Sequence, residues 1–230
     1  MFNIAVIVNT LAVLIGGTLG TFIGNKLPDN LRLILFQSVG LTTFLIGIGM
    51  GLDASNLIVV LVSLALGGVI GELLRIENGL GKLANIVERS QGETPFVRGF
   101  ITATVLFVIG PMTIIGCLNA GLSGDNSVIF LKSVLDGISS MVLASVYGVG
   151  VTFSAVSVFL IQGSIVSLAG MLSFLSNPYY LNDFTAVGGA MIIAIGIRLL
   201  EIKDIKVGNF LPSLIIVVLI NYILTFFGRF

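Results

Sequence analysis

The sequence contains no histidine and no tryptophan, and Cys117 is its only cysteine. A lone cysteine cannot form a disulfide within the chain, and without histidine neither a Cys/His zinc site nor a histidine-held haem can be built. A Ser-His-Asp hydrolase is excluded for the same reason. No Walker-type Gly-rich word with Lys-Ser/Thr occurs, so ATP-driven activity would need a partner subunit. We therefore expect that the protein binds no cofactor and is not an enzyme. Carboxylates and carbonyl oxygens remain as ligands for a hard cation, and the sequence does not specify a metal.

Charge is also scarce. Only 10% of the 230 residues are charged, the formal net charge is zero, and 56% are hydrophobic. The mean hydropathy is +1.14, whereas in soluble domains about 25% of residues are charged. There is no basic surface for nucleic acid. This composition predicts an all-α, polytopic membrane protein whose main partner is the lipid bilayer.

Eight apolar segments are long enough to cross a bilayer, which requires about 20 residues each. They form a single transmembrane domain, residues 1–230. The first segment lacks a positive n-region and is too long for an ordinary signal peptide, so we expect it to be retained. The eight segments are Phe2–Ile23, Leu33–Leu52, Leu57–Leu74, Phe100–Leu118, Val128–Gly148, Val151–Leu172, Phe184–Leu200 and Leu211–Phe227.

Lysine and arginine are distributed unequally between the two sides of an eight-span topology. One side receives Lys26, Arg32, four basic residues of Arg75–Arg98 and three of Arg198–Lys206. By the positive-inside rule this side is cytoplasmic, which places both termini in the periplasm. With seven spans the Arg198–Lys206 cluster would lie on the periplasmic side, against the positive-inside rule. A re-entrant hairpin in the middle of the chain would give the same sidedness as eight spans. The Arg75–Arg98 connection is predicted to contain a short amphipathic helix.

Two alignments suggest an internal two-fold repeat. Gly71–Asn78 resembles Ile197–Asp204 at an offset of 126, which would make two parallel halves, residues 1–122 and 123–230. Alternatively, Ile46-Gly-Ile48 matches Ile195-Gly-Ile197, which would relate the first three spans to the last three by inversion. The sequence does not decide between them.

Lys132 and Asp136 are the most informative residues, because they lie four positions apart within an otherwise apolar segment. That spacing places both charges on one helical face. A lone charge at mid-bilayer costs roughly 2.5–3.5 kcal/mol on insertion scales, and such residues commonly line a substrate or ion path. A polar site can be completed by Ser133, Ser139, Ser140 and Gln162. The alternative is a structural ion pair, with Lys132 extending to the interface and Gln162 making one interhelical hydrogen bond.

Gly110-Pro111 interrupts the fourth segment in its middle. Proline removes a backbone donor and clashes with the preceding turn, so the helix is expected to kink or unwind there. Carbonyls freed in this way, together with the nearby Thr113 and Asn119, would be candidate ligands for an ion or polar solute. A simple proline kink is the alternative.

Charged residues and small residues suggest two further contacts. Glu72/Arg75 and Arg198/Glu201 are spaced to pair on one helical face, either as structural ion pairs or as a gate. Glycines recur every four residues at Gly16, Gly20 and Gly24, and again at Gly67 and Gly71. These seams allow close helix packing, and from them we also predict a homodimer. A similar small-residue seam lies along the fifth segment and predicts that it is buried among other helices.

Several words of the sequence resemble a bacterial membrane family of unknown function, typified by YdfK and YqgA. They are Leu106–Met112, Lys132–Gly137, Gln162-Gly163, Gly208–Pro212 and Gly71–Glu77. The resemblance covers nearly the whole chain and implies the bacterial inner membrane. Where that family often carries cysteine before Ile109-Gly-Pro, this sequence has Val108. The resemblance also implies that Gly110-Pro111, Lys132 and Asp136 are the positions where a functional site is to be expected.

The sequence as a whole favours a secondary transporter of a small ion or polar solute, with a mid-membrane polar site around Asp136. The alternative is a non-transporting membrane subunit or sensor in which Lys132/Asp136 only fixes packing. An intramembrane enzyme is disfavoured, because Asp136 would act with neither His nor Cys ligands nearby.

Overall fold

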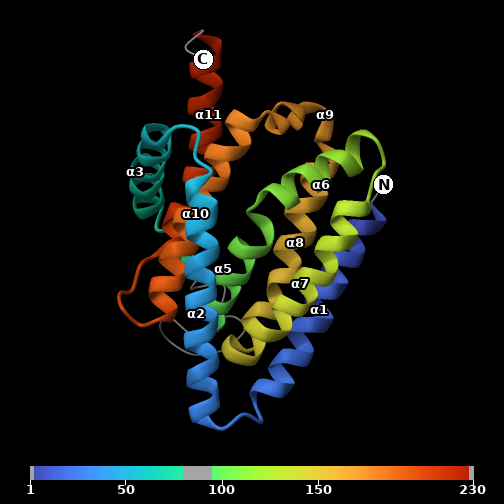
Figure 1. Cartoon of the computed structure of the whole chain (residues 1–230), viewed down its shortest axis with the longest axis vertical. Coiled ribbons are helices and arrows are strands. Elements are labelled where there is room, and N and C mark those ends of the chain that lie inside the picture. The colour runs from blue at the N-terminus through green and yellow to red at the C-terminus, as the bar shows by residue number, and fades with distance from the viewer. Residues whose placement is uncertain (1–2, 80–94, 228–230) are drawn as a thin grey trace.

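The computed structural model describes residues 3–79 and 95–227, and within these ranges it contains helices and no strands (Figure 1). In chain order the elements are α1 (Ile4–Gly24), α2 (Asp29–Leu52), α3 (Leu57–Leu74), α5 (Pro95–Val108), α6 (Pro111–Leu122), α7 (Ser127–Tyr147), α8 (Val149–Ser167), α9 (Ala169–Leu172), η1 (Ser173–Ser176), α10 (Pro178–Leu199), η2 (Val207–Phe210) and α11 (Ser213–Phe226).

Helix boundaries follow local signals in the sequence. Asn3, Asn56 and Asn177 precede α1, α3 and α10, and each side chain accepts a hydrogen bond from a backbone N–H of the first turn. Asparagine is a preferred N-cap because it satisfies donors that have no partner within the helix. Between α7 and α8 only Gly148 marks the break, with φ of 74°. A positive φ of this size favours glycine.

The prediction of an all-α, polytopic membrane protein is confirmed. Within the described residues, seven helices are long and apolar enough to cross a membrane, and α5 with α6 is a pair bent by 57° that makes an eighth crossing if the two helices form one span. The break lies at Gly110, whose φ of 152° is a conformation that other residues rarely adopt. Pro111 then occupies the start of α6, where its missing N–H costs nothing. The predicted helix in the Arg75–Arg98 connection lies mostly outside the described residues.

Glycines allow α1 to lie directly on the backbone of α7. A side chain at Gly16, Gly20 or Gly24 would overlap a backbone carbonyl of α7, at Gly137, Met141 and Ser145 respectively. Because both sets of numbers increase together, the two helices are parallel. The seam predicted for the fifth span is confirmed, since Ser133, Ser140 and Ala144 are buried.

The second close pair, α2 and α10, is antiparallel. Gly47 and Gly189 face each other, because a side chain on either would overlap the backbone oxygen of the other. Gly40 faces Leu199 and Leu200, and Gly196 faces Phe44. The spacing of Gly40 and Gly47 is repeated at Gly189 and Gly196, 149 positions later in both cases (40 to 189, 47 to 196). The inverted alignment relates α2 to α10 and requires the two helices to run in opposite directions, as they do.

The parallel alignment also has a structural counterpart. Arg75 after α3 and Glu201 after α10, which are 126 positions apart (75 to 201), both adopt left-handed conformations, with φ of 53° and 56°. Non-glycine residues seldom adopt this conformation. The two helices therefore end in the same unusual way.

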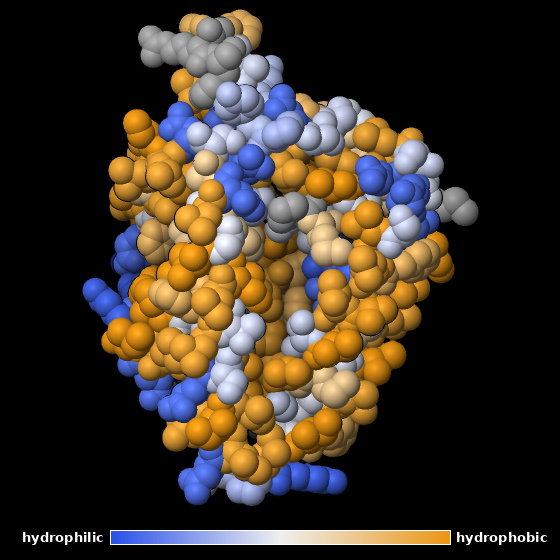
Figure 2. Space-filling model, in the orientation of Figure 1, coloured by the Kyte–Doolittle hydropathy of each residue, from blue (hydrophilic) through white to orange (hydrophobic). Residues whose placement is uncertain are grey.

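The helices form two groups. One contains α1, α5, α6, α7 and α8, and the other contains α2, α3, α10 and α11. Apolar side chains cover most of the flanks, as expected for a surface in contact with lipid, and the visible face is hollowed where the groups meet between α2 and α7 (Figure 2). The glycine seams lie inside this fold, because Gly67 and Gly71 pack on Ser213 and Asn209. The seams therefore do not supply the surface from which a homodimer was predicted.

Candidate functional site

An ion pair lies at the middle of α7. Lys132 Nζ donates a hydrogen bond to Asp136 Oδ1 at 2.8 Å, one helical turn away, and the two residues are only 7% and 5% exposed. At 1.5 Å per residue, Asp136 lies about 15 Å from either end of the helix. The helix is about as long as a hydrocarbon layer of about 30 Å is thick, and Asp136 lies near its middle. The sequence prediction of a buried, paired charge is confirmed.

Two amide side chains extend this pair into a network that joins three helices. Asn9 of α1 donates through Nδ2 to the second carboxylate oxygen of Asp136 at 3.0 Å, and also to Gln162 Oε1 of α8 at 3.1 Å. Asn9 and Gln162 are both fully buried. Asp136 thus accepts one charged and one neutral hydrogen bond, and its negative charge is offset by Lys132. We call Asn9, Lys132, Asp136 and Gln162 the central network.

The packing of α1 and α6 against α7 encloses the network. Asn9 lies two turns before Gly16 on α1, whose glycine seam brings the two backbones together. On another side, a Cβ at Gly116 of α6 would lie 3.0 Å from Val128 and 3.2 Å from Ile129, so these helices are also in close contact. Small residues on α1 and α6 therefore bring a helix on each side close to Lys132 and Asp136, which shields the charges from lipid.

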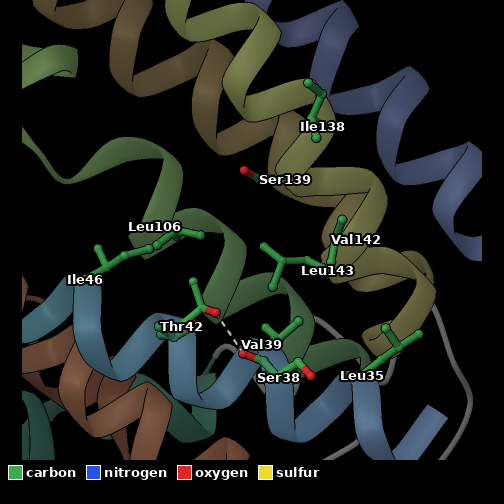
Figure 3. Close-up of a pocket in the computed structure, with 11 residues that line it drawn as sticks. Leu35, Ser38, Val39, Thr42, Ile46, Leu106, Ile138, Ser139, Val142 and Leu143 are labelled. Atoms are coloured by element: carbon green, nitrogen blue, oxygen red, sulfur yellow. Dashed lines mark hydrogen bonds between the residues drawn. The ribbon is translucent and has the colours of Figure 1, made fainter. Parts of the chain in front are cut away.

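Two cavities have lining residues close in the chain to residues of the network. One, of about 300 Å³, lies between the start of α1 and the end of α8 and includes Val6 and Gly163 in its lining. Val6 is one turn from Asn9, and Gly163 adjoins Gln162. The other, of about 260 Å³, lies between α2, α5 and α7. Figure 3 shows Ser139 of α7 pointing into it, opposite Thr42 and Leu106. Ser139 is one turn beyond Asp136, so each cavity ends about one helical turn from the network.

Other predicted site residues are not part of the network. Ser133 and Ser140 are buried and donate to the carbonyls of Ile129 and Gly137 within α7. Thr113 donates to the carbonyl of Phe107 at 3.1 Å, across the break between α5 and α6. One carbonyl freed at Gly110-Pro111 is thus satisfied internally, and neither Gly110 nor Thr113 bonds to Asp136. Asn119 is half-buried in the last turn of α6.

The charged pairs predicted at the ends of α3 and α10 have different partners from those expected. Arg198 contacts Glu77 at 3.1 Å and Asp204 at 2.8 Å, whereas Glu72 contacts Lys206 at 3.1 Å. Arg75 and Glu201 lie beyond the helices in left-handed conformations, so the spacing of three no longer places them on a helical face. The ion pairs therefore connect α3 and the residues after it with α10 and the connection to α11.

The sequence analysis missed three residues that make buried polar contacts. Asn9 lies within the first predicted span and was not assigned to the site. Asp183 of α10 is completely buried, and its Oδ1 accepts from the backbone N–H groups of Ser55 and Asn56, both at 2.8 Å. Its Oδ2 accepts from Asn221 at 3.1 Å. Asp183 escaped notice because the predicted span began at Phe184.

A protein-only metal site is not evident in the part of the chain that the structure describes. Within residues 3–79 and 95–227, no group of three or more metal-ligating carboxylates or thiols is assembled. Cys117 is buried and free, in α6. The central network offers one carboxylate and two amides, which can bind a proton or a polar solute without a permanent metal.

Comparison with known proteins gives one family and two relatives. A family model described as "Protein of unknown function (DUF554)" matches residues 4–222. The chain is 34% identical over 226 residues to the "Uncharacterized membrane protein YdfK" of Bacillus subtilis, covering 96% of this chain and 97% of that protein. It is 32% identical over 216 residues to the "Uncharacterized protein YqgA" of Escherichia coli, covering 91% and 92%. No solved structure matches it.

Proposed function

This chain belongs to the DUF554 family of membrane proteins of unknown function, and from that premise we propose that it is a secondary carrier of a small ion or polar solute, rather than an enzyme. The observation that carries the proposal is the central network. A carboxylate and an ammonium group are held at mid-membrane by α1, α7 and α8, although burying two charges costs several kcal/mol per ion. Such residues generally mark a solute or ion pathway.

The two cavities support the same proposal. A carrier must expose its site first to one side of the membrane and then to the other. Here one cavity approaches the network from the side of Asn3 and Ser167, and the other begins at Ser139 between the two helix groups. Relative movement of the two groups would open either path, with Asp136 as the coupling residue and Lys132 as its counter-ion.

Location and orientation are part of the proposal. We assign the protein to the bacterial inner membrane, with both termini in the periplasm. Both relatives are bacterial, and Arg98, Arg198 and Lys203 gather around one cavity at the end where α10 finishes. A homodimer would use surfaces other than the glycine seams. The outer face of α3, where Leu57, Ile58 and Leu73 are at least 70% exposed, is the surface we propose.

Reconstitution tests the transport proposal. Purified protein would be placed in proteoliposomes containing a pH-sensitive dye, and amino acids, amides, carboxylic acids and monovalent cations would be added one at a time. We expect a solute-dependent proton flux that Asp136→Asn abolishes and Asp53→Asn, a change in an exposed connection, leaves intact. Absence of any flux above empty liposomes across the whole panel would reject a proton-coupled carrier.

The alternative function, a non-transporting subunit or sensor, is favoured by one observation. Lys132 and Asp136 satisfy each other directly at 2.8 Å, as a purely structural pair would. Under this alternative Asp136→Asn changes stability and leaves solute movement unaffected. The proteoliposome experiment therefore separates the two functions.

A further inference from the structure

Two buried polar atoms of the central network have no hydrogen-bond partner. They are Asn9 Oδ1, an acceptor, and Gln162 Nε2, a donor, on residues that are 0% exposed. Buried polar groups in proteins are nearly always satisfied. The side chains of Asn9 and Gln162 are hydrogen-bonded to each other. One solute that carries a donor and an acceptor on neighbouring atoms would satisfy both the free acceptor and the free donor.

The charge of Asp136 determines which atom of each amide is left without a hydrogen-bond partner. An ionised carboxylate only accepts hydrogen bonds, so Asn9 must present its NH₂ group to it. The same NH₂ group donates to Gln162, which must therefore present its Oε1. The orientation of both amides is thus fixed from Asp136 outward, and it leaves an acceptor free on Asn9 and a donor free on Gln162.

We propose that protonation of Asp136 reverses this arrangement and thereby couples proton binding to solute binding. When Oδ2 carries the proton, its O–H donates to Asn9, whose amide rotates by half a turn so that Oδ1 accepts. Gln162 rotates likewise and donates Nε2 to the same oxygen. The free atoms are then Asn9 Nδ2, a donor, and Gln162 Oε1, an acceptor. Each protonation state favours one orientation of the solute's donor and acceptor.

Few other charged or titratable groups face this switch. Helices α1 and α8 contain no acidic, basic, cysteine or tyrosine residue. On α7 the facing group is Lys132, and on α6 it is Cys117, which lies within electrostatic range of Lys132. Protonation of Asp136 removes the negative charge that offsets the Lys132 ammonium group. A solute that presents an acceptor to Lys132 is therefore favoured in the protonated state.

These features define a substrate class, and the inference rests on the proposed carrier function. The expected solute is small and carries a donor beside an acceptor, as a carboxamide or a carboxylic acid does. The cavity of about 300 Å³ between α1 and α8 has room for such a molecule and has Asn3, Ser164 and Ser167 in its wall. Its lining includes Val6, one helical turn from Asn9, and Gly163, the chain neighbour of Gln162.

The switch can be observed without knowing the solute. Protein whose asparagine and glutamine side chains carry ¹⁵N would be titrated in lipid nanodiscs and followed by infrared difference spectroscopy. We expect a carboxylic acid band to appear on acidification, together with shifted side-chain amide bands at the same midpoint. Both changes should be lost in Asp136→Asn. In Gln162→Leu the acid band should remain and the amide change should shrink, whereas Gln37→Leu, which removes an exposed amide of α2, should retain both.

The result is read independently of transport. A carboxyl band that titrates without an amide change, an amide change that survives in Asp136→Asn, or no titrating carboxyl at all would overturn the switch. If the bands shift together and the proteoliposomes show no flux, the switch stands and the carrier proposal fails. If flux is present and the amide bands do not move, the carrier proposal stands and the switch fails.

Discussion

At the scale of single residues, substitutions in the Lys132–Asp136 pair distinguish the effect of charge from the effect of side-chain shape. Asp136→Asn keeps the size of the side chain, its Oδ1 can still accept from Lys132, and its NH₂ group can donate to Asn9 once the Asn9 amide turns. We therefore expect folding to be largely preserved and coupled transport to be lost. Lys132→Ala instead leaves a carboxylate without its counter-ion in a site that is 5% exposed. Removing one partner of a buried ion pair costs about 3–5 kcal/mol.

Thermal unfolding in detergent measures this difference. We expect Lys132→Ala to lower the melting temperature far more than Lys203→Ala, which removes an exposed lysine after α10. The double variant Lys132→Ala/Asp136→Asn should recover part of the loss, because no unpaired charge remains. Normal transport by Asp136→Asn would make the pair structural and place the transport site elsewhere.

Sequence reasoning found the charged members of the site more readily than the neutral ones. Lys132 and Asp136 stand out because a charge within an apolar run has a large and predictable cost. Asn9 carries no charge, and its partners are 127 and 153 positions away (9 to 136, 9 to 162). No local pattern predicts such a contact, because it depends on how α1 and α8 pack around α7. Ser133 and Ser140 had the right spacing, but their hydroxyls donate to backbone carbonyls of α7 itself.

At the scale of helices, the glycine seam of α1 predicts which substitutions the fold tolerates. A methyl group at Gly20 would overlap the carbonyl of Met141, so α1 and α7 must separate to admit it. Overpacking of this kind typically costs about 1–3 kcal/mol. Gly49 of α2 has nothing within 4 Å of the position its Cβ would occupy. There alanine should be neutral or stabilising by up to about 1 kcal/mol, because glycine is unfavourable within a helix.

Unfolding midpoints and native masses of the two variants check this prediction. Gly20→Ala should be destabilised with an unchanged oligomeric mass, because its seam lies within the chain. Gly49→Ala should resemble the wild type in both. A change of oligomeric mass in Gly20→Ala without loss of stability would contradict the intrachain role of the seam.

The connection between α2 and α3 is held by a residue of α10. Asp183 accepts two backbone N–H groups at 2.8 Å, from Ser55 and Asn56 immediately before α3. The positive end of the α3 dipole adds to this attraction. In Asp183→Ala these donors lose their acceptor, and each unsatisfied buried group costs about 1–3 kcal/mol. We expect the start of α3 to open more often.

Hydrogen exchange followed by mass spectrometry would detect this opening. Peptides that cover residues 53–60 should exchange faster in Asp183→Ala, whereas peptides from α7 should be unchanged. Asp53→Ala is the matched control, because it removes an exposed carboxylate from the same connection. Equal exchange in the two variants would show that Asp183 does not hold the connection.

Helix positions were predictable to the extent that local chemistry determines them. The break at Gly110-Pro111 follows from proline and glycine alone, and the apolar segments correspond to the observed spans. The partners of Arg198 were predicted incorrectly, since the chain leaves the helix at Glu201 in a left-handed conformation and Glu77 approaches from beyond α3. A non-glycine residue in that conformation has no signature in the sequence, because tertiary contacts impose it.

At the scale of the whole molecule, the proposed access to the site depends on how the two helix groups meet. The parallel α1–α7 pair and the antiparallel α2–α10 pair are each tightly packed at glycines, whereas α2 and α7 face each other across the cavity lined by Thr42 and Ser139. Close-packed contacts have low compressibility, so we expect each pair to move as a unit. A movement between the groups would therefore change the cavity at Ser139 more than the hydrogen bonds of the central network.

The orientation of the whole molecule in the membrane is the last prediction. Eight spans place both termini on one side, and the Lys/Arg asymmetry makes that side the periplasm. In Figure 1 the start of α1 and the end of α11 both lie in the upper half of the view. The exposed connections after α2 and α6 belong to the same side, and those after α1 and α10 to the other. Cysteines introduced at Asp53 and Ser123 should thus face outward, and those at Lys26 and Lys203 inward.

Labelling with a membrane-impermeant maleimide tests this orientation. The unmodified chain serves as the blank, because its Cys117 is completely buried. We expect Asp53→Cys and Ser123→Cys to be labelled in intact cells, and Lys26→Cys and Lys203→Cys only after permeabilisation. The reverse pattern would invert the topology and with it the side from which the cavity between α1 and α8 is filled. Labelling of Asp53→Cys and Ser123→Cys from opposite sides would instead mean that α5 and α6 form a re-entrant hairpin, because α3 would then be the one crossing between those two positions.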